Sequence, residues 1–287
     1  MTGHPVQVWW ARLGDARAGL LGLLDPVERA RYESTADPAG KGRFLVGCAL
    51  SRLVLGELLD LPPADVPLRR VCPRCGGPHG KVRLEVPPNG PSGSGSDSPP
   101  DSRPSVPTGG SPVWDFSVTH SGALVGVAVC RDGEVGLDVE ESHAAVDVDS
   151  AARVALSDSE RAALYARPAE ERQPAFLRTW TRKEAVLKAL GVGLTVPLRE
   201  LEVSAPDRPP AVLAWPGRLA ARPRTAMADL VVDGTHPAAV AVAVAGAGTG
   251  TGTGAGAGTG AGEEKGEVTE VRVLLRDGTS TLAAYDR

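Results

Sequence analysis

The chain has 287 residues, of which 42% are hydrophobic, with a formal net charge of -4 and a pI near 5.8. This length allows one large domain or two small ones, and the weak acidity argues against a nucleic-acid-binding protein, which would present a basic face. No apolar run approaches the roughly 18 residues of a membrane span, and residues 1–10 lack the pattern of a secretory signal. We therefore expect a soluble cytoplasmic protein with no membrane or nucleic-acid partner.

The first half of the sequence predicts helices followed by strands. Pro26 suits the first turn of a short helix, and apolar residues then recur at helical spacing in a longer one. The expected elements are an apolar stretch, a short helix, a long helix, a Pro- and Cys-rich hairpin region and two strands, at residues 6–13, 25–32, 42–59, 66–86, 114–118 and 124–130.

The second half repeats this order. Ser157, followed by Glu160 three residues later, predicts a capping box at the start of a short helix. Gly191 is expected to end a long helix. Besides the short helix, the expected elements are a strand at 134–140, the long helix at 173–190, and strands at 201–203, 211–215, 227–232 and 238–244.

Composition and element order together predict the domain organisation. Residues 86–112 are almost wholly Pro, Gly, Ser and Asp, and residues 246–262 alternate Gly, Thr and Ala, so both are interpreted as flexible insertions. Long helices with antiparallel strands occur twice. We therefore expect an α+β fold of two similar α/β subdomains, residues 1–132 and 133–287, related by a pseudo-twofold. A site built between two halves of one chain is consistent with a monomer.

Acidic residues alternate with apolar ones in the strand expected at 134–140. Asp138 and Glu140 would face one side of it, about 6.6 Å apart. Two carboxylates at that separation can converge on one cation, and their oxygens suit magnesium. An ordinary strand with one exposed face shows the same alternation, so this segment alone favours the plainer interpretation.

The long helix carries a second acidic group. Trp180, Glu184 and Lys188 recur every four residues and lie within a band of about 80°, beside the apolar stripe of the helix. A Glu–Lys pair at this spacing also stabilises exposed helices by a few tenths of a kcal/mol. The nearby Trp and the apolar flank argue against a fully solvated pair.

Three segments in this order resemble the signature of the 4'-phosphopantetheinyl transferase superfamily, Sfp type. They are residues 116–122 (Phe-Ser-Val-Thr-His-Ser-Gly), 136–140 (Gly-Leu-Asp-Val-Glu) and 180–185 (Trp-Thr-Arg-Lys-Glu-Ala) followed by Lys188. The resemblance covers nearly the whole chain apart from the two insertions. It implies a magnesium-dependent enzyme that transfers the phosphopantetheine arm of coenzyme A to a serine of an apo acyl or peptidyl carrier protein and releases 3',5'-ADP.

The resemblance also implies roles for individual residues. Asp138, Glu140 and Glu184 would hold the magnesium ion, and Glu184 is also the candidate base for the serine proton. Lys188 would stabilise the charge that develops on the pyrophosphate, with Lys183 as a supporting cation. The residues expected to bind coenzyme A are Arg43, Lys81, Thr119, His120 and Ser121.

Other interpretations remain open at this stage. A relative that binds coenzyme A or a carrier protein without turnover would share the same motifs. Cys72, Cys75 and His79 form part of a zinc-binding pattern but lack a fourth ligand. The glycine tract loosely imitates a dinucleotide fingerprint, which would indicate a nicotinamide-dependent oxidoreductase, but the helix that this motif requires does not follow. The carrier could belong to a polyketide, nonribosomal-peptide or fatty-acid synthase.

Overall fold

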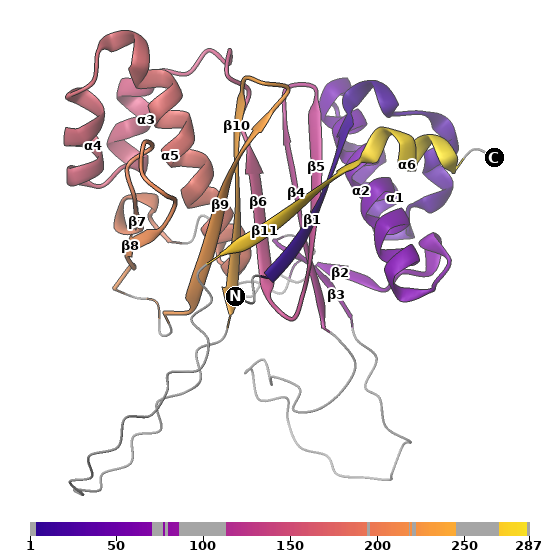
Figure 1. The fold of residues 1–287 in the computed structure, drawn as a ribbon. Coiled ribbons are helices and arrows are strands. Elements are labelled where there is room, and N and C mark those ends of the chain that lie inside the picture. Colours follow the sequence, from indigo (N-terminus) through magenta and orange to yellow (C-terminus); the bar gives the residue numbers. More distant parts are fainter. Residues whose placement is uncertain are drawn as a thin grey trace, which may run out of the picture.

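A computed structural model describes residues 4–70, 77, 80–85, 113–193, 196–217, 219, 222–244 and 270–285. Two sheets stand in the middle of the molecule, with one group of helices on either side (Figure 1). The two expected insertions and the three residues of the zinc-binding pattern lie outside the described residues.

The first sheet and its helices come from both ends of the chain. Their elements are β1 (His4–Arg12), α1 (Pro26–Ser34), α2 (Pro38–Leu59), β4 (Trp114–Ser121), β5 (Leu124–Arg131), β11 (Val271–Asp277) and α6 (Gly278–Ala284). The strand order is β11-β1-β5-β4, with β11 parallel to β1 and the other pairs antiparallel. α2 and α6 pack on this sheet, and α1 packs on α2. Leu45, Leu50 and Val127 are part of the core between them.

The second sheet has three strands and a helical layer of its own. Its elements are β6 (Glu134–Val139), α3 (Val148–Ala155), α4 (Asp158–Tyr165), α5 (Ala169–Leu190), β9 (Arg224–Val232) and β10 (His236–Val244). The order is β6-β10-β9, all antiparallel. α5 lies across β6 and β10, and α3 and α4 pack on α5.

Short elements connect these layers. Two small hairpins pair β2 (Leu68–Arg70) with β3 (Val82–Leu84) and β7 (Glu202–Val203) with β8 (Val212–Ala214). Single 3-10 turns occur at Leu13–Asp15, Ala18–Leu23, Pro63–Asp65 and Leu198–Glu200. Within the described part of the chain, no helix combines the length and the apolarity that crossing a membrane requires.

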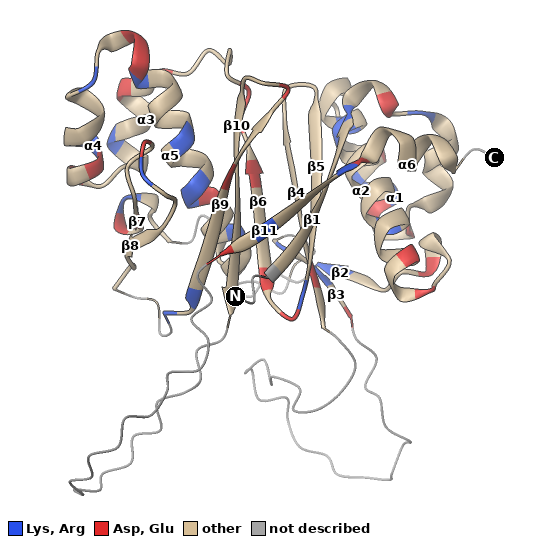
Figure 2. Ribbon diagram, in the orientation of Figure 1, with Lys and Arg blue, Asp and Glu red and all other residues tan. Residues whose placement is uncertain are grey.

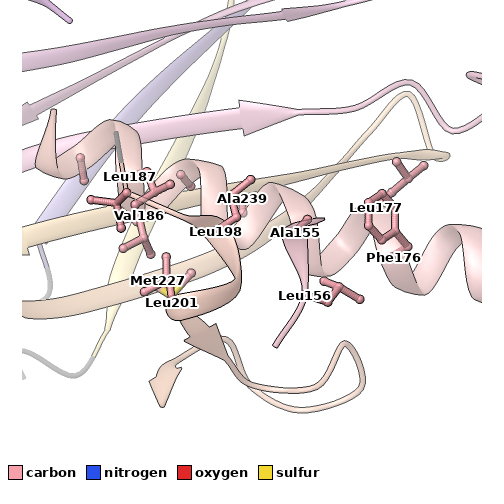
Figure 3. Close-up of a cluster of buried hydrophobic side chains, with 14 of the residues drawn as sticks. Ala155, Leu156, Phe176, Leu177, Val186, Leu187, Leu198, Leu201, Met227 and Ala239 are labelled. Carbon is pink, nitrogen blue, oxygen red and sulfur yellow. The ribbon is translucent and has the colours of Figure 1, made fainter. Parts of the chain in front are cut away.

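Helix α5 is held by its apolar face and by a glycine cap. Phe176, Leu177, Val186 and Leu187 are buried in one cluster with residues of α3, β9 and β10 (Figure 3). Gly191 ends the helix with φ +66°, and its N–H bonds to the carbonyls of Leu187 and Lys188, so the expected C-terminal cap is confirmed. This burial fixes the rotation of α5 about its axis, and therefore where Glu184 and Lys188 point.

The α+β architecture expected from the sequence is confirmed. The capping box of Ser157 and Glu160 is present at the start of α4, and the sheet orders β1-β5-β4 and β6-β10-β9 correspond strand for strand. Three elements were not anticipated: α3, β11 and α6. β11 pairs with β1 in the first sheet, and α6 packs on that sheet. The sequence-based division at residue 133 had placed both elements in the second subdomain.

Candidate functional site

A row of side chains on β4 joins the two sheets where β6 leaves an open edge. Every second backbone N–H from Val135 to Glu141, along β6 and just past its end, donates to a side-chain oxygen on β4, at 2.7 to 3.3 Å. We call this row the β4–β6 ladder. Its donor–acceptor pairs are Val135–Asp115, Leu137–Ser117, Val139–Thr119 and Glu141–Ser121. The ladder places Thr119 and Ser121 beside the acidic residues of β6.

Asp138 is the most deeply buried carboxylate of the site, with 5% of its surface exposed. Its Oδ1 accepts from Lys188 Nζ at 2.6 Å and from the Thr119 hydroxyl at 3.3 Å. Its Oδ2 is also buried and has no hydrogen-bond partner among the described residues. Burial raises the pKa of Asp138, and the Lys188 ammonium opposes that rise.

Glu140 is half-buried, and each of its oxygens has a neutral donor. Oε1 accepts from the Trp180 indole N–H at 3.0 Å, and Oε2 accepts from the Ser121 hydroxyl at 3.1 Å. Burial raises the pKa of Glu140, and the Asp138 charge raises it further. The carboxylate is therefore held from both sides, by β4 and by α5.

Glu184 approaches the same place from α5. Its Oε1 is buried and unpartnered within the described structure. Its pKa is raised first by burial and then by the charge of Asp138, while Lys188 lowers it. The Lys188 ammonium also donates to the Leu137 carbonyl at 3.1 Å. The strand and the helix thus bring Asp138, Glu184 and Lys188 close to one another, as expected from the sequence. Figure 2 shows acidic residues on β6 and basic residues on α5.

The donor set fits a hard divalent cation that is shared with a substrate. Among the described residues, no three His, Cys, Asp or Glu side chains are grouped so that they could hold a metal ion by themselves. Magnesium seldom has a complete cage of protein ligands, because it keeps several waters and binds through one or two carboxylates plus substrate phosphate. Buried, unpartnered oxygens on Asp138 and Glu184 carry an electrostatic cost that a cation would relieve. These residues therefore fit a magnesium ion without enclosing it.

Arg43 and His120 border a separate cavity of about 170 Å³ between α2 and β4. Arg43 donates to the Gly122 carbonyl at 3.0 Å. The pKa of His120 is lowered, first by burial and then by the charges of Arg43 and Lys188. Arg31, stacked on Phe44 at 5.1 Å, and Arg70 also line the cavity, so its charge suits an anion.

Sequence reasoning missed Arg31 and Arg70 as members of this basic cavity. In the sequence, Arg31 looks like an ordinary basic residue in the last turn of a helix. Arg70 looks like an ordinary residue of a short hairpin strand. Because the cavity forms only when α1, α2 and β2 meet, local patterns carried no signal for either.

Two lysines have surroundings that differ from those expected. Lys81 pairs with Asp115 at 2.5 Å and donates to the carbonyls of Val135 and Ala189, at the opposite end of β4 from His120. Lys183 was expected to be a supporting cation, but it is fully buried, pairs with Glu160 and donates to two backbone carbonyls. Both ammonium groups are committed to contacts inside the protein.

Residues 134–242, which include Asp138, Glu140, Glu184 and Lys188, match a family model described as the 4'-phosphopantetheinyl transferase superfamily. The resemblance to this superfamily is thus confirmed over residues 134–242. The matched segment begins at β6 and ends in β10, so it contains the strand and the helix that carry the acidic residues.

This chain is similar over part of its length to proteins named as 4'-phosphopantetheinyl transferases. It is 35% identical to HetI of Nostoc sp. over 126 residues, which are 44% of this chain and 50% of that protein. It is 38% identical to AcpT of Salmonella typhimurium over 82 residues, 29% of this chain and 42% of that one. A putative transferase of Synechocystis sp. is 28% identical over 64% of this chain and 63% of its own length. The chain spans half or less of the HetI and AcpT sequences.

A solved structure is also similar to part of this chain. Holo-[acyl-carrier-protein] synthase of Thermotoga maritima matches it with a TM-score of 0.32 and 20% sequence identity. The match covers 39% of this chain and 63% of that one.

Proposed function

We propose that this protein transfers the 4'-phosphopantetheine moiety of coenzyme A to a serine of an apo carrier protein, releases 3',5'-ADP and requires magnesium. The observation that carries the proposal is that Asp138 and Glu184 interact beside Lys188, each with a buried carboxylate oxygen that has no partner within the described structure. Phosphoryl-group transfer depends mainly on positioning and on neutralising charge, and this arrangement supplies both.

The three carboxylates would hold the magnesium ion, which supplies charge neutralisation at the pyrophosphate when bound. Asp138 offers its free Oδ2 from the floor of the site, and Glu140 is held in one orientation by Trp180 and Ser121. Glu184 faces them from α5. Two elements, β6 and α5, would therefore contribute the ligands.

Glu184 is our candidate for the group that accepts the serine proton. Its pKa is raised by burial and by Asp138, which brings its proton affinity closer to that of a general base working near neutral pH. The Lys188 ammonium donates to Asp138, Leu137 and Thr119 and is partly exposed, so we propose that its charge stabilises the leaving pyrophosphate from this fixed position.

The basic cavity is our candidate site for the nucleotide end of coenzyme A. Arg43 and His120, expected from the sequence to bind it, meet Arg31 and Arg70 there. Lys81, Thr119 and Ser121 are hydrogen-bonded to the protein's own acidic groups. We therefore propose that these three organise the site and do not bind coenzyme A directly.

We further propose a monomer of the Sfp type, because one chain supplies both β4 and β6 to the site. Carrier proteins of polyketide, nonribosomal-peptide or fatty-acid synthases are the proposed acceptors. A cytoplasmic location is supported by the buried, unpaired thiols of Cys48 and Cys130, which suit a reducing compartment.

The deciding experiment is a carrier panel. The protein is incubated with coenzyme A, magnesium and several apo carrier proteins, and the intact mass of each carrier is measured. We expect at least one carrier to gain one phosphopantetheine group, and we expect Asp138→Ala or removal of magnesium to prevent the gain. Unchanged carriers together with tight coenzyme A binding would instead indicate a relative that binds without turnover.

A further inference from the structure

The hydroxyl groups of the β4–β6 ladder make more contacts than joining two strands requires. Ser121 Oγ accepts the Glu141 N–H at 2.9 Å and also donates to Glu140 Oε2 at 3.1 Å. Thr119 Oγ1 accepts the Val139 N–H and donates to Asp138 Oδ1, both at 3.3 Å. Each hydroxyl therefore binds one backbone N–H and the side chain of the residue just before it.

A hydroxyl group can make both contacts, because it donates one hydrogen and accepts others, whereas an ionised carboxylate only accepts and an apolar side chain does neither. At one end of the ladder, Asp115 accepts from Val135 and from Lys81. The residue before Val135 is Glu134, and its carboxylate pairs instead with Arg83.

Ser117 shows what the ladder does without a carboxylate. Its hydroxyl accepts the Leu137 N–H at 3.0 Å. The residue before Leu137 is Gly136, which has no side chain to receive a hydrogen bond. Ser117 therefore holds the strand as its neighbours do, without touching an acidic residue.

We propose that Thr119 and Ser121 are positioning residues for the cation site, and that their hydroxyls fix the orientations of the Asp138 and Glu140 carboxylates relative to β6. This inference rests on the proposed cation role of those carboxylates. It differs from the coenzyme A contacts first expected for Thr119 and Ser121. Groups that orient metal ligands commonly change metal affinity by about 10- to 100-fold when removed.

The test measures Mn²⁺ binding to the full chain by the electron paramagnetic resonance signal of free Mn²⁺, with and without coenzyme A. Ser121→Ala and Thr119→Val are expected to weaken Mn²⁺ binding about 10-fold. Thr119→Ser retains the hydroxyl and is expected to bind Mn²⁺ as the unmodified protein does. The affinity for coenzyme A, measured at saturating Mn²⁺, is expected to change less than twofold.

Ser117→Ala is the matched control, because it removes the same type of contact to β6. It is expected to lower resistance to urea while leaving Mn²⁺ affinity within twofold. Equal losses of Mn²⁺ affinity in Ser117→Ala and Ser121→Ala would reduce the effect to strand pairing and overturn the inference. The inference would also be overturned if Ser121→Ala bound Mn²⁺ normally but bound coenzyme A more weakly. It would be overturned as well if the unmodified protein did not bind Mn²⁺.

The two proposals can fail separately. If the variants behave as expected towards Mn²⁺ but no carrier gains mass, the proposed transfer fails and the positioning role stands. If carriers are modified but Ser121→Ala and Thr119→Val bind Mn²⁺ normally, the positioning role fails and the transfer stands.

Discussion

Lys183 and Glu184 are adjacent in the sequence but have opposite surroundings. Lys183 is fully buried and paired with Glu160 of α4. Glu184 is half-buried, and its Oε1 has no partner within the described structure. A buried charge is tolerated when it is paired and hydrogen-bonded, so Lys183 contributes to the packing of α5 while Glu184 remains available for chemistry.

Replacing Glu184 should separate stability from function. In the folded protein the pKa of the Glu184 carboxyl is raised above its ordinary value of 4.5. The carboxyl therefore stabilises the folded state fully at pH values below 4.5. This stabilisation is lost as the pH rises through the pKa of the folded state. In metal-free protein, Glu184→Gln should therefore be more stable than the unmodified protein at pH 8, with the difference shrinking towards pH 4.5. Carrier modification at pH 8 should fall by about 10²- to 10⁴-fold.

Urea denaturation at both pH values measures the first effect, and the intact mass of the carrier over time measures the second. If the metal-free unmodified protein is more stable than Glu184→Gln at pH 8, the raised pKa of Glu184 is contradicted. Near-normal transfer by Glu184→Gln would remove Glu184 from the proposed role.

The sequence could predict which residues form the acidic group but not how they are held. The two-residue period placed Asp138 and Glu140 on one face of a strand, and the four-residue period aligned Glu184 with Lys188. The ion pair of Lys188 with Asp138 and the Trp180 contact to Glu140 depend on how α5 lies across β6. That arrangement is set by tertiary packing, which no local pattern records.

At the scale of elements, the site depends on the close approach of α5 to β6. A methyl group on Gly136 would lie 1.9 Å from the Ala185 carbonyl oxygen and 2.5 Å from the Ala189 nitrogen. The helix backbone therefore rests directly on the strand at this glycine. On the helix the contact lies at Ala185 and Ala189, the residues that follow Glu184 and Lys188, and on the strand it lies two residues before Asp138.

Gly136→Ala should therefore disturb both the fold and the site. The added methyl group forces the helix away from the strand, and overpacking of this kind typically costs about 1–3 kcal/mol of unfolding free energy. Cation affinity should fall as well, because Glu184 moves away from Asp138. Urea denaturation and Mn²⁺ binding measure the two effects.

Gly133→Ala provides a comparison at the start of β6. There the nearest contact, at 2.8 Å, is the Val242 side chain and not a backbone. This variant should retain Mn²⁺ affinity. Equal loss of Mn²⁺ affinity in both variants would show that the Gly136 contact has no special role.

Elements were predictable where their signals are local. Capping residues and apolar spacing were enough to locate α2, α4 and α5. β11 follows a glycine-rich tract and pairs with β1 from the other end of the chain, so its place in the sheet could not be inferred from its own seven residues. The short helix α3 was missed.

At the scale of the whole molecule, each half has a buried ion pair that joins its long helix to the capping box of a short helix. In the first half, Arg52 of α2 is 1% exposed and pairs with Asp25 and Glu28, the capping box of α1. In the second half, Lys183 of α5 pairs with Glu160 of the α4 capping box. The correspondence supports the pseudo-twofold relation more directly than sequence similarity between the halves does.

Removing either buried cation should destabilise the protein strongly. Arg52→Met and Lys183→Met each leave acidic groups without their partner, at an expected cost of about 3–5 kcal/mol of unfolding free energy. Arg161→Ala is the control, because its pair with Asp158 is exposed and worth about 1 kcal/mol or less. Urea denaturation compares the three. A loss below 1 kcal/mol for both buried positions would mean that the pairs do not hold the helices.

The pairing of β11 with β1 has a consequence for synthesis on the ribosome. Residues 4–10 leave the exit tunnel long before their parallel partner, residues 271–277, is made. The hydrogen bonds on that side of β1 cannot form until then, and such distant pairings are slow to close. A nascent chain would therefore expose this edge of β1 until residues 271–277 emerge, which makes that edge the expected place for a chaperone to act.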